Sequence, residues 1–165
     1  MKGILGIAAV LSFFLLLGQT AMPTPPAYVI TKFTRLQFQG TAQSPEVYST
    51  SYPVMSLSAS GSGIANQLGE ITLIYRGEID LTDFSTVESA QFLAKNGDSI
   101  EVTGVGQATE TATPGIFNVI QIYKVTGGTG RFTGARGTIT LQRTMNMASG
   151  LTNSTFEGYL LLPYR

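Results

Sequence analysis

The chain has 165 residues, with ten Lys and Arg against ten Asp and Glu, and it contains no Cys, His or Trp. Its length predicts a single domain that can bury a real core. The missing residue types exclude disulfides, thiolate nucleophiles, Ser-His-Asp triads and His-containing zinc sites, and they leave carboxylates, Tyr, Lys and Arg for acid–base chemistry. We therefore expect no metal and no cofactor. With no net charge and no two basic residues in a row, the sequence gives no basic footprint for nucleic acid.

The N-terminus is predicted to be a signal peptide. Lys2 supplies a positive charge, residues 4–17 form an apolar run, and residues 18–21 turn small and polar. Because the run is shorter than the roughly 20 residues of a membrane-spanning helix, cleavage after Ala21 is favoured over an uncleaved anchor. The expected organisation is a signal peptide at 1–21, a Pro-rich linker at 22–27 and one domain at 28–165. The mature protein is then secreted or periplasmic and has no stable membrane span.

From residue 28 onward the chain shows period-2 runs broken by Gly, Pro, Asn and Asp. Asn96-Gly97 predicts a tight hairpin turn, and Pro45 and Pro53 bracket a predicted polar loop. Regular spacing without a long crossover favours an all-β fold, an up-and-down antiparallel sheet whose eight strands close into a small barrel. The predicted strands are 28–39, 54–61, 68–80, 84–94, 99–110, 116–126, 134–145 and 155–162.

Several of these strands carry apolar side chains on both faces. In 116–126, Ile120 and Ile122 alternate with Val119 and Tyr123. One face must line the interior, and the other needs a neighbouring loop or a second subunit to cover it. Exposed apolar area of this kind is typical of interfaces, which leaves a homo-oligomer and a monomer equally favoured.

Residues 125–137, with the sequence VTGGTGRFTGARG, form a glycine-rich corner. This corner resembles the GGTGxFxxARG corner of plant dirigent proteins and the related stretch of allene oxide cyclases. A closer resemblance is to small secreted bacterial barrel proteins, which also have an Asn-Gly-Asp turn (here 96–98), a GxxGQAT strand (here GVGQAT at 104–109, one residue shorter) and a Phe-Glu-Gly strand (156–158). The resemblance implies an eight-stranded antiparallel barrel of the allene oxide cyclase and dirigent type, which the strand count predicts separately.

We interpret this corner as structural. Neither a Gly-Lys-Ser/Thr sequence nor a helix follows the glycines, so the usual phosphate-binding mechanism is missing. Glycines permit positive φ angles, bulges and close strand approach where a barrel bends, and Phe132 is predicted to plug the barrel end. The structural corner comprises Gly127, Gly128, Gly130, Phe132, Gly134 and Gly137.

The resemblance also implies that chemistry takes place inside the barrel. Dirigent proteins orient a phenoxy-radical coupling, and allene oxide cyclases close a ring in an oxidised fatty acid. The polar residues of both families come mostly from earlier strands, where this chain does not match their pattern residue by residue. No catalytic residue is therefore assigned.

Four residues are candidates for ligand binding: Tyr75, Tyr123, Arg143 and Glu157. The tyrosines are amphipathic and suit either a pocket or the core. If the last hairpin loop centres on Gly150, antiparallel pairing places Arg143 opposite Glu157. This pair would lie either inside a ligand cavity or at the barrel rim, where cross-strand ion pairs are common.

Two further patterns are interpreted as surface features. The densest acidic stretch runs from Glu70 through Glu78 and Asp80 to Glu88, and a solvated outer face is favoured there over a carboxylate pair or a Ca²⁺ site. Asn153 begins a glycosylation sequon, which we expect to be unused because the closer resemblance is bacterial.

Three functions remain open. The first, which we predict, is a secreted barrel that binds a small apolar or aromatic molecule. The second is a dirigent- or cyclase-like enzyme that directs cyclisation or coupling by shape. The third is an envelope-associated structural protein with a packed interior. An open apolar cavity favours the first function, convergent carboxylate, Arg and Tyr groups favour the second, and a filled interior favours the third.

Overall fold

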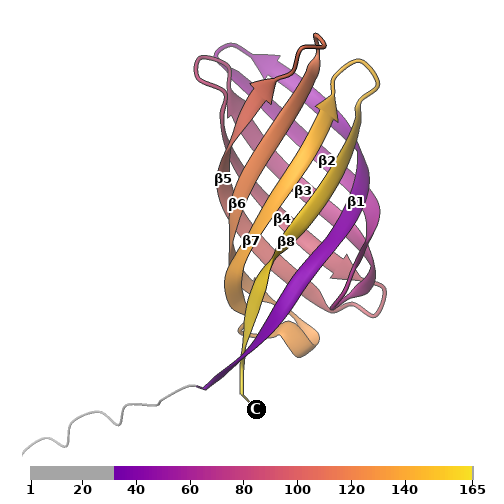
Figure 1. Ribbon diagram of the computed structural model, residues 1–165, viewed down its shortest axis with the longest axis vertical. Helices are drawn as coiled ribbons and strands as arrows, with labels where there is room; N and C mark the ends of the chain where they lie inside the picture. Colours follow the sequence, from indigo (N-terminus) through magenta and orange to yellow (C-terminus); the bar gives the residue numbers. More distant parts are fainter. Residues whose placement is uncertain (1–31, 165) are drawn as a thin grey trace, which may run out of the picture. The chain divides into compact units, whose positions relative to one another are not determined.

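The computed structural model describes residues 32–164, which form a closed barrel of eight antiparallel strands (Figure 1). Each strand pairs with its neighbours in sequence, and β8 closes the barrel on β1, so the predicted architecture is confirmed. The elements are β1 (Phe33–Ser51), β2 (Val54–Ala65), β3 (Gly69–Asp80), β4 (Ser85–Ala94), β5 (Ser99–Glu110), β6 (Ile116–Gly128), the short 3-10 helix η1 (Gly130–Phe132), β7 (Arg136–Asn146) and β8 (Leu151–Pro163).

The two ends of the barrel differ. Figure 1 shows the start of β1, the end of β8 and η1 together at one end, which we call the base. The loops at 52–53, 81–84, 111–115 and 147–150 form the other end, which we call the mouth. The predicted signal peptide and linker lie outside the described residues. No helix within residues 32–164 has the length and apolarity needed to cross a membrane.

The first strand differs most from its prediction. β1 continues to Ser51, so the predicted polar loop between Pro45 and Pro53 is wrong. Ser44 and Glu46 are buried and face the barrel interior, which made an inward-facing strand look like a polar loop. The β1–β2 ladder tolerates Pro45, which lacks an N–H, because it passes from Gln43 directly to Glu46.

The core lies inside the barrel and is aromatic toward the base. Phe38, Phe92 and Phe156 pack together with ring centroids 4.9 to 5.4 Å apart. Phe132 of η1 is 1% exposed and belongs to the same buried cluster. Side chains therefore fill this half of the barrel, as expected for eight strands.

The outer face keeps the apolar residues that made strand parity ambiguous. Val119 and Tyr123 of β6 point inward, whereas Ile122 is 58% exposed. Val87, Val105 and Ile122 are successive cross-strand partners and form a continuous apolar row on the outside of β4, β5 and β6. Because the single chain leaves this row uncovered, oligomerisation stays a prediction.

The glycine corner joins β6 to β7 at the base. Gly130, Gly134 and Gly137 have positive φ angles, of 57°, 75° and 144°, whereas Gly127 and Gly128 do not. The β5–β6 register shifts between Glu101 and Val102, whose partners are Gly127 and Val125, so Thr126 of β6 is the extra residue of a bulge. The corner thus combines left-handed backbone with a bulge, two devices that bend a sheet.

Candidate functional site

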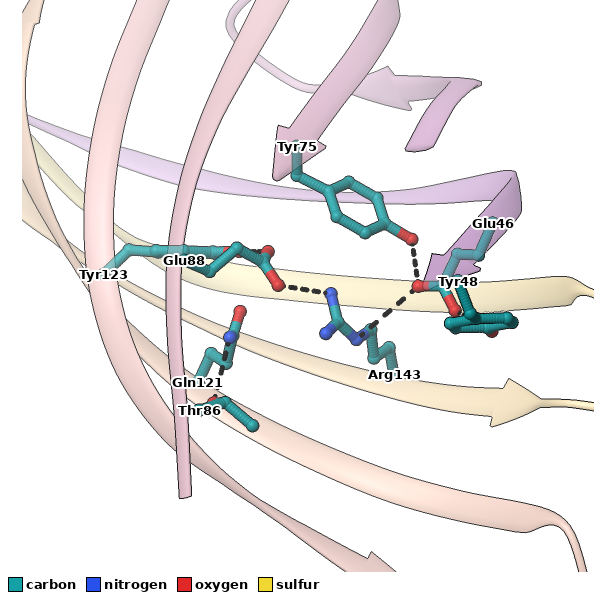
Figure 2. A network of polar contacts seen from close by, with 8 residues as sticks. All are labelled: Glu46, Tyr48, Tyr75, Thr86, Glu88, Gln121, Tyr123 and Arg143. Atoms are coloured by element: carbon teal, nitrogen blue, oxygen red, sulfur yellow. Dashed lines mark hydrogen bonds and ion pairs between the residues drawn. The ribbon is translucent and has the colours of Figure 1, made fainter. Parts of the chain in front are cut away.

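A buried ion cluster lies inside the barrel (Figure 2). Arg143 on β7 lies between Glu88 on β4 and Glu46 on β1, and its Nη1 donates a hydrogen bond of 2.7 Å to Glu88 Oε2. Its Nε lies 3.9 Å from Glu46 Oε1, which is close enough for an ion pair but too far for a hydrogen bond. All three charged side chains are at most 1% exposed.

Three tyrosine hydroxyls complete this cluster. Tyr75 and Tyr48 donate to the two oxygens of Glu46, and Tyr123 donates to Glu88 Oε1. Together with the bond from Arg143, every oxygen of the two carboxylates has a hydrogen-bond partner. The guanidinium also lies 5.0 Å from the ring centroid of Tyr75, a cation–π contact. We call Glu46, Tyr48, Tyr75, Glu88, Tyr123 and Arg143 the polar cluster.

Glycines on neighbouring strands make room for these large side chains. Gly77, Glu88, Gly104 and Tyr123 are successive cross-strand partners on β3 to β6, so glycine alternates with a bulky residue along one row. A Cβ atom at Gly104 would lie 2.5 Å from the Tyr123 ring. The absence of a side chain at these glycines therefore leaves room inside the barrel for the large side chains of the polar cluster.

Burial and charge set the protonation of the polar cluster. Burial raises the pKa of Glu88, against the opposing effects of Arg143 and Tyr123, which favour its charged form. Burial, with the nearby carboxylates, raises the pKa of Tyr48, Tyr75 and Tyr123, so their hydroxyls stay protonated and donate. Burial lowers the pKa of Arg143, but Glu88 and Glu46 outweigh it and the net shift is upward, so the guanidinium stays charged.

The raised pKa of Glu88 predicts a specific pH dependence of stability. The stability that protonated Glu88 contributes is fully present below the ordinary carboxyl pKa of 4.5. It is lost as pH rises through the higher pKa that Glu88 has in the folded protein. Urea denaturation of Glu88→Gln between pH 4.5 and 7 should therefore show a weaker fall of stability with pH than the unmodified chain does.

Asp83 provides the control for this experiment. Hydrogen bonds from Ser85 lower the pKa of Asp83 from 3.8, so its contribution is lost only as pH falls below that range. Asp83→Asn should change the profile below pH 4 and leave the window above pH 4.5 unchanged. An identical slope above pH 4.5 in Glu88→Gln and the unmodified chain would contradict the assignment to Glu88.

Some buried donors of this region have no protein partner among the described residues. They include Arg143 Nη2 and the hydroxyls of Ser44 and Ser154. The three residues lie on adjacent strands β7, β8 and β1, and Arg143 is the direct cross-strand partner of Ser154. Beside Arg143, where each carboxylate oxygen already accepts a hydrogen bond, the unused hydrogen-bonding capacity is that of donors and suits an acceptor oxygen. Gln121 Oε1 is a buried acceptor without a partner among the described residues.

A small apolar cavity of about 140 Å³ lies at the mouth. Met55, Ile79, Ala108 and Met145 form its buried part. Its remaining lining residues, nearer the rim, are Thr50, Leu81, Phe84, Phe117 and Met147. Thr50 and Met145 come two residues after Tyr48 and Arg143, so two strands lead from the polar cluster to the cavity on one face. An apolar cavity of about 150 Å³ holds a molecule the size of benzene.

Larger hollows lie on the outer face. Two of them, of about 740 and 660 Å³, are lined mostly by hydroxyl and amide side chains of β1, β2, β6, β7 and β8, and the lining of the first includes Arg143. A third, of about 460 Å³ on β2, β3 and β4, includes Glu88 in its lining. No group of three or more acidic side chains within residues 32–164 is placed to hold a metal ion.

Comparisons with known proteins identify the fold. No family model and no curated protein sequence matches the chain. The solved structure of the pterocarpan synthase dirigent protein GePTS1 matches it with a TM-score of 0.56 and 12% identity, over 87% of this chain and 99% of that one. The barrel has the dirigent protein fold. The solved structure of the pterocarpan synthase dirigent protein PsPTS1 also matches the chain, with a TM-score of 0.54 and 12% identity, over 81% of this chain and 97% of that one. At this identity the likeness shows the fold alone.

The dirigent-like barrel brings together three of the four predicted binding residues. Tyr75, Tyr123 and Arg143 all belong to the polar cluster, as Figure 2 shows. Glu157 lies elsewhere. It is exposed on the outer face of β8, opposite Thr140, and it lines one of the outer hollows. Whether these residues bind a ligand stays a prediction.

The predicted pairing of Arg143 with Glu157 is wrong, and the turn explains why. Asn146 Oδ1 accepts hydrogen bonds from the backbone N–H groups of Ala148 and Ser149, so a short loop of residues 147–150 closes the hairpin and its centre lies before Gly150. Gly150, with a φ of 67°, ends this loop instead of centring it. The resulting register places Arg143 opposite Ser154, three residues before Glu157. Because neighbouring residues of a strand face opposite sides, a shift by an odd number of residues places Glu157 on the outer face.

Sequence reasoning missed half of the polar cluster. Glu46 and Tyr48 fell within the wrongly predicted loop, and Glu88 was assigned to a solvated outer face, whereas it is 3% exposed. The available signal was parity. Glu88 has the same parity as Ala90 and Phe92, which are buried, so it shares their inward face.

Proposed function

We propose that the dirigent-like barrel binds a small aromatic or apolar molecule that enters at the mouth and carries an acceptor oxygen. One observation carries this proposal. The apolar cavity at the mouth leads toward the polar cluster, whose buried groups without a partner are the donors Nε and Nη2 of Arg143. An apolar pocket with a few convergent polar groups is the usual form of a small-molecule site.

The cavity limits the size of the ligand. Its volume of about 140 Å³ is below the roughly 300 Å³ at which sites for drug-sized ligands begin. A single ring with a short polar substituent fits this volume. Since each carboxylate oxygen of Glu46 and Glu88 already accepts from a protein donor, the unpartnered Nη2 of Arg143 favours a ligand that accepts a hydrogen bond over one that only donates.

Acetophenone and ethylbenzene test this proposal as a matched pair, because they differ mainly in one carbonyl oxygen. A hydrogen bond to a charged group contributes about 1.5–3 kcal/mol, so acetophenone should bind about 10- to 100-fold more tightly. Ligand-observed NMR titration of the purified chain measures both affinities. Equal affinity for the two compounds would contradict the role of the donors, and no binding of either would favour a packed structural barrel.

Ala108→Leu should remove this binding, because Ala108 is 2% exposed and the longer side chain fills the cavity. Thr109→Leu is the matched control, since Thr109 is the exposed neighbour on the same strand. Retained acetophenone binding in Ala108→Leu would place the ligand outside this cavity.

A second candidate function is a shape-directed cyclisation, and Glu88 is the observation that favours it. Burial raises the pKa of this carboxyl beside Arg143, which favours proton transfer, and the structural neighbours are described as pterocarpan synthase dirigent proteins. In such a reaction Glu88 gives its proton to a leaving hydroxyl, the carbon–oxygen bond breaks and water departs. An internal phenol oxygen then bonds to that carbon and returns its proton to Glu88. A phenol with a secondary alcohol tests this step by chiral chromatography, where Glu88→Gln should keep binding but lose turnover.

A further inference from the structure

Exposed basic residues from distant parts of the sequence gather at the base. Arg35 of β1 and Arg136 of β7 are both direct cross-strand partners of Leu161 on β8. Lys124 of β6 and Arg136 line one hollow of about 320 Å³ on the outer face. Lys32 directly precedes β1, and its carbonyl accepts a hydrogen bond from Tyr164. We call Lys32, Arg35, Lys124 and Arg136 the basic strip.

The basic strip is not neutralised within the barrel. None of its four residues forms an ion pair within residues 32–164, although two other basic residues at the base, Lys95 and Arg131, pair with Glu70 and Asp98. The acidic residues nearest along the neighbouring strands are Glu101 on β5 and Glu157 on β8. The charge of the strip is therefore available to an external partner.

Aromatic side chains accompany these charges. Arg35 stacks on the ring of Tyr159, with its guanidinium carbon 4.3 Å from the centroid, and Arg136 lies 6.0 Å from the centroid of Phe33. Phe33 and Tyr164 are 40% and 74% exposed. Arg and Lys with exposed Tyr and Phe are characteristic of surfaces that sit at a lipid headgroup layer.

The mouth has the opposite charge. Asp80, Asp83 and Glu110 lie at its strand ends and loops, and none of the four mouth loops contains Lys or Arg. A chain with no net charge is therefore polarised along the barrel axis. An anionic surface would attract the base and repel the mouth.

We infer that the basic strip docks the barrel, base first, on an anionic lipid surface. The base favours this occupant over other anions because the exposed aromatic side chains of Phe33 and Tyr164 accompany the charges and suit a lipid headgroup layer. Docking in this direction leaves the mouth cavity facing away from the lipid. The basic strip contains no residue of the polar cluster or of the cavity, so docking is a property separate from the proposed function.

Vesicle sedimentation of the purified full chain tests this inference. Large vesicles of phosphatidylcholine alone are compared with vesicles containing a third phosphatidylglycerol, in low and in physiological salt. We expect binding to the anionic vesicles that weakens with salt. Each basic residue near such a surface strengthens binding about fivefold, so Arg35→Gln with Arg136→Gln should weaken it about 30-fold.

Arg76→Gln provides the matched control for Arg136→Gln. Arg76 is exposed on β3, away from the strip, and it has no ion pair within the described residues. It should weaken vesicle binding less than twofold, against about fivefold for Arg136→Gln. Equal losses in the two variants, or equal binding to neutral and anionic vesicles, would overturn the inference. Acetophenone affinity of the Arg35 and Arg136 double variant should be unchanged, which separates this test from that of the mouth.

Discussion

Replacement of Arg143 by Met is expected to lower the free energy of unfolding by about 3–5 kcal/mol at pH 7. The substitution leaves Glu46 and Glu88 inside the barrel without their shared guanidinium, and both side chains are at most 1% exposed. An unpaired buried charge costs far more than the pair contributes. Urea denaturation at pH 7 and pH 4.5 measures this loss, which should shrink at the lower pH because protonation of Glu88, whose pKa burial raises, removes one of the uncompensated charges.

The triple variant with Glu46→Gln, Glu88→Gln and Arg143→Met is the control. It removes all three charges while it keeps similar volumes, and replacement of a whole buried ion cluster by neutral residues is often close to neutral in stability. We expect it to recover most of the loss. If Arg143→Met alone costs less than about 1 kcal/mol, the carboxylates do not depend on the guanidinium in the way the distances indicate.

Gly137→Ala is expected to lower the free energy of unfolding by about 2–4 kcal/mol, the second large effect. Gly137 has a φ of 144°, and a Cβ atom there would lie 2.1 Å from the carbonyl oxygen of Tyr159. The substitution must therefore both strain the backbone and push β7 from β8. Thermal denaturation followed by circular dichroism measures the change.

Gly127→Ala, in the same glycine corner, should cost less than about 0.5 kcal/mol. Its backbone has no positive φ, and the nearest atom to an added Cβ is a Glu101 oxygen at 3.9 Å. The two glycines look equivalent in sequence, so the pair separates geometry from composition. Equal losses at both positions would show that the corner resists any side chain for another reason.

The sequence predicts the barrel well because local signals mark most of its hairpins. The Asn96-Gly97 turn fixes β5 at Ser99–Glu110, which is the predicted range. Glycine and proline mark the other breaks closely enough to count the strands. The failure at β1 has a physical origin. A strand whose inward face carries Ser44 and Glu46 has no apolar periodicity, so only its tertiary surroundings identify it.

The polar cluster is less predictable because its geometry depends on register. Residue type alone selected Tyr75, Tyr123 and Arg143, but nothing local shows that Ile122 faces outward while Tyr123 faces inward. One loop that ends at Gly150 instead of centring on it was enough to exchange Glu157 for Glu46 and Glu88 as the partners of Arg143. Long-range pairing determines which carboxylates meet the guanidinium, and that information is not local.

The closure of β8 on β1 determines when the barrel can fold. Within residues 32–164 every other strand ladder joins sequence neighbours, whereas this one pairs Phe33 with Pro163. Its loop-closure entropy is therefore the largest of the eight, growing as about 1.5 RT times the logarithm of the loop length. During synthesis one edge of the 19-residue β1 stays unpaired until β8, the last strand of 13 residues, has been made. Until then the sheet keeps two open edges, so the growing chain is most prone to aggregation just before it is complete.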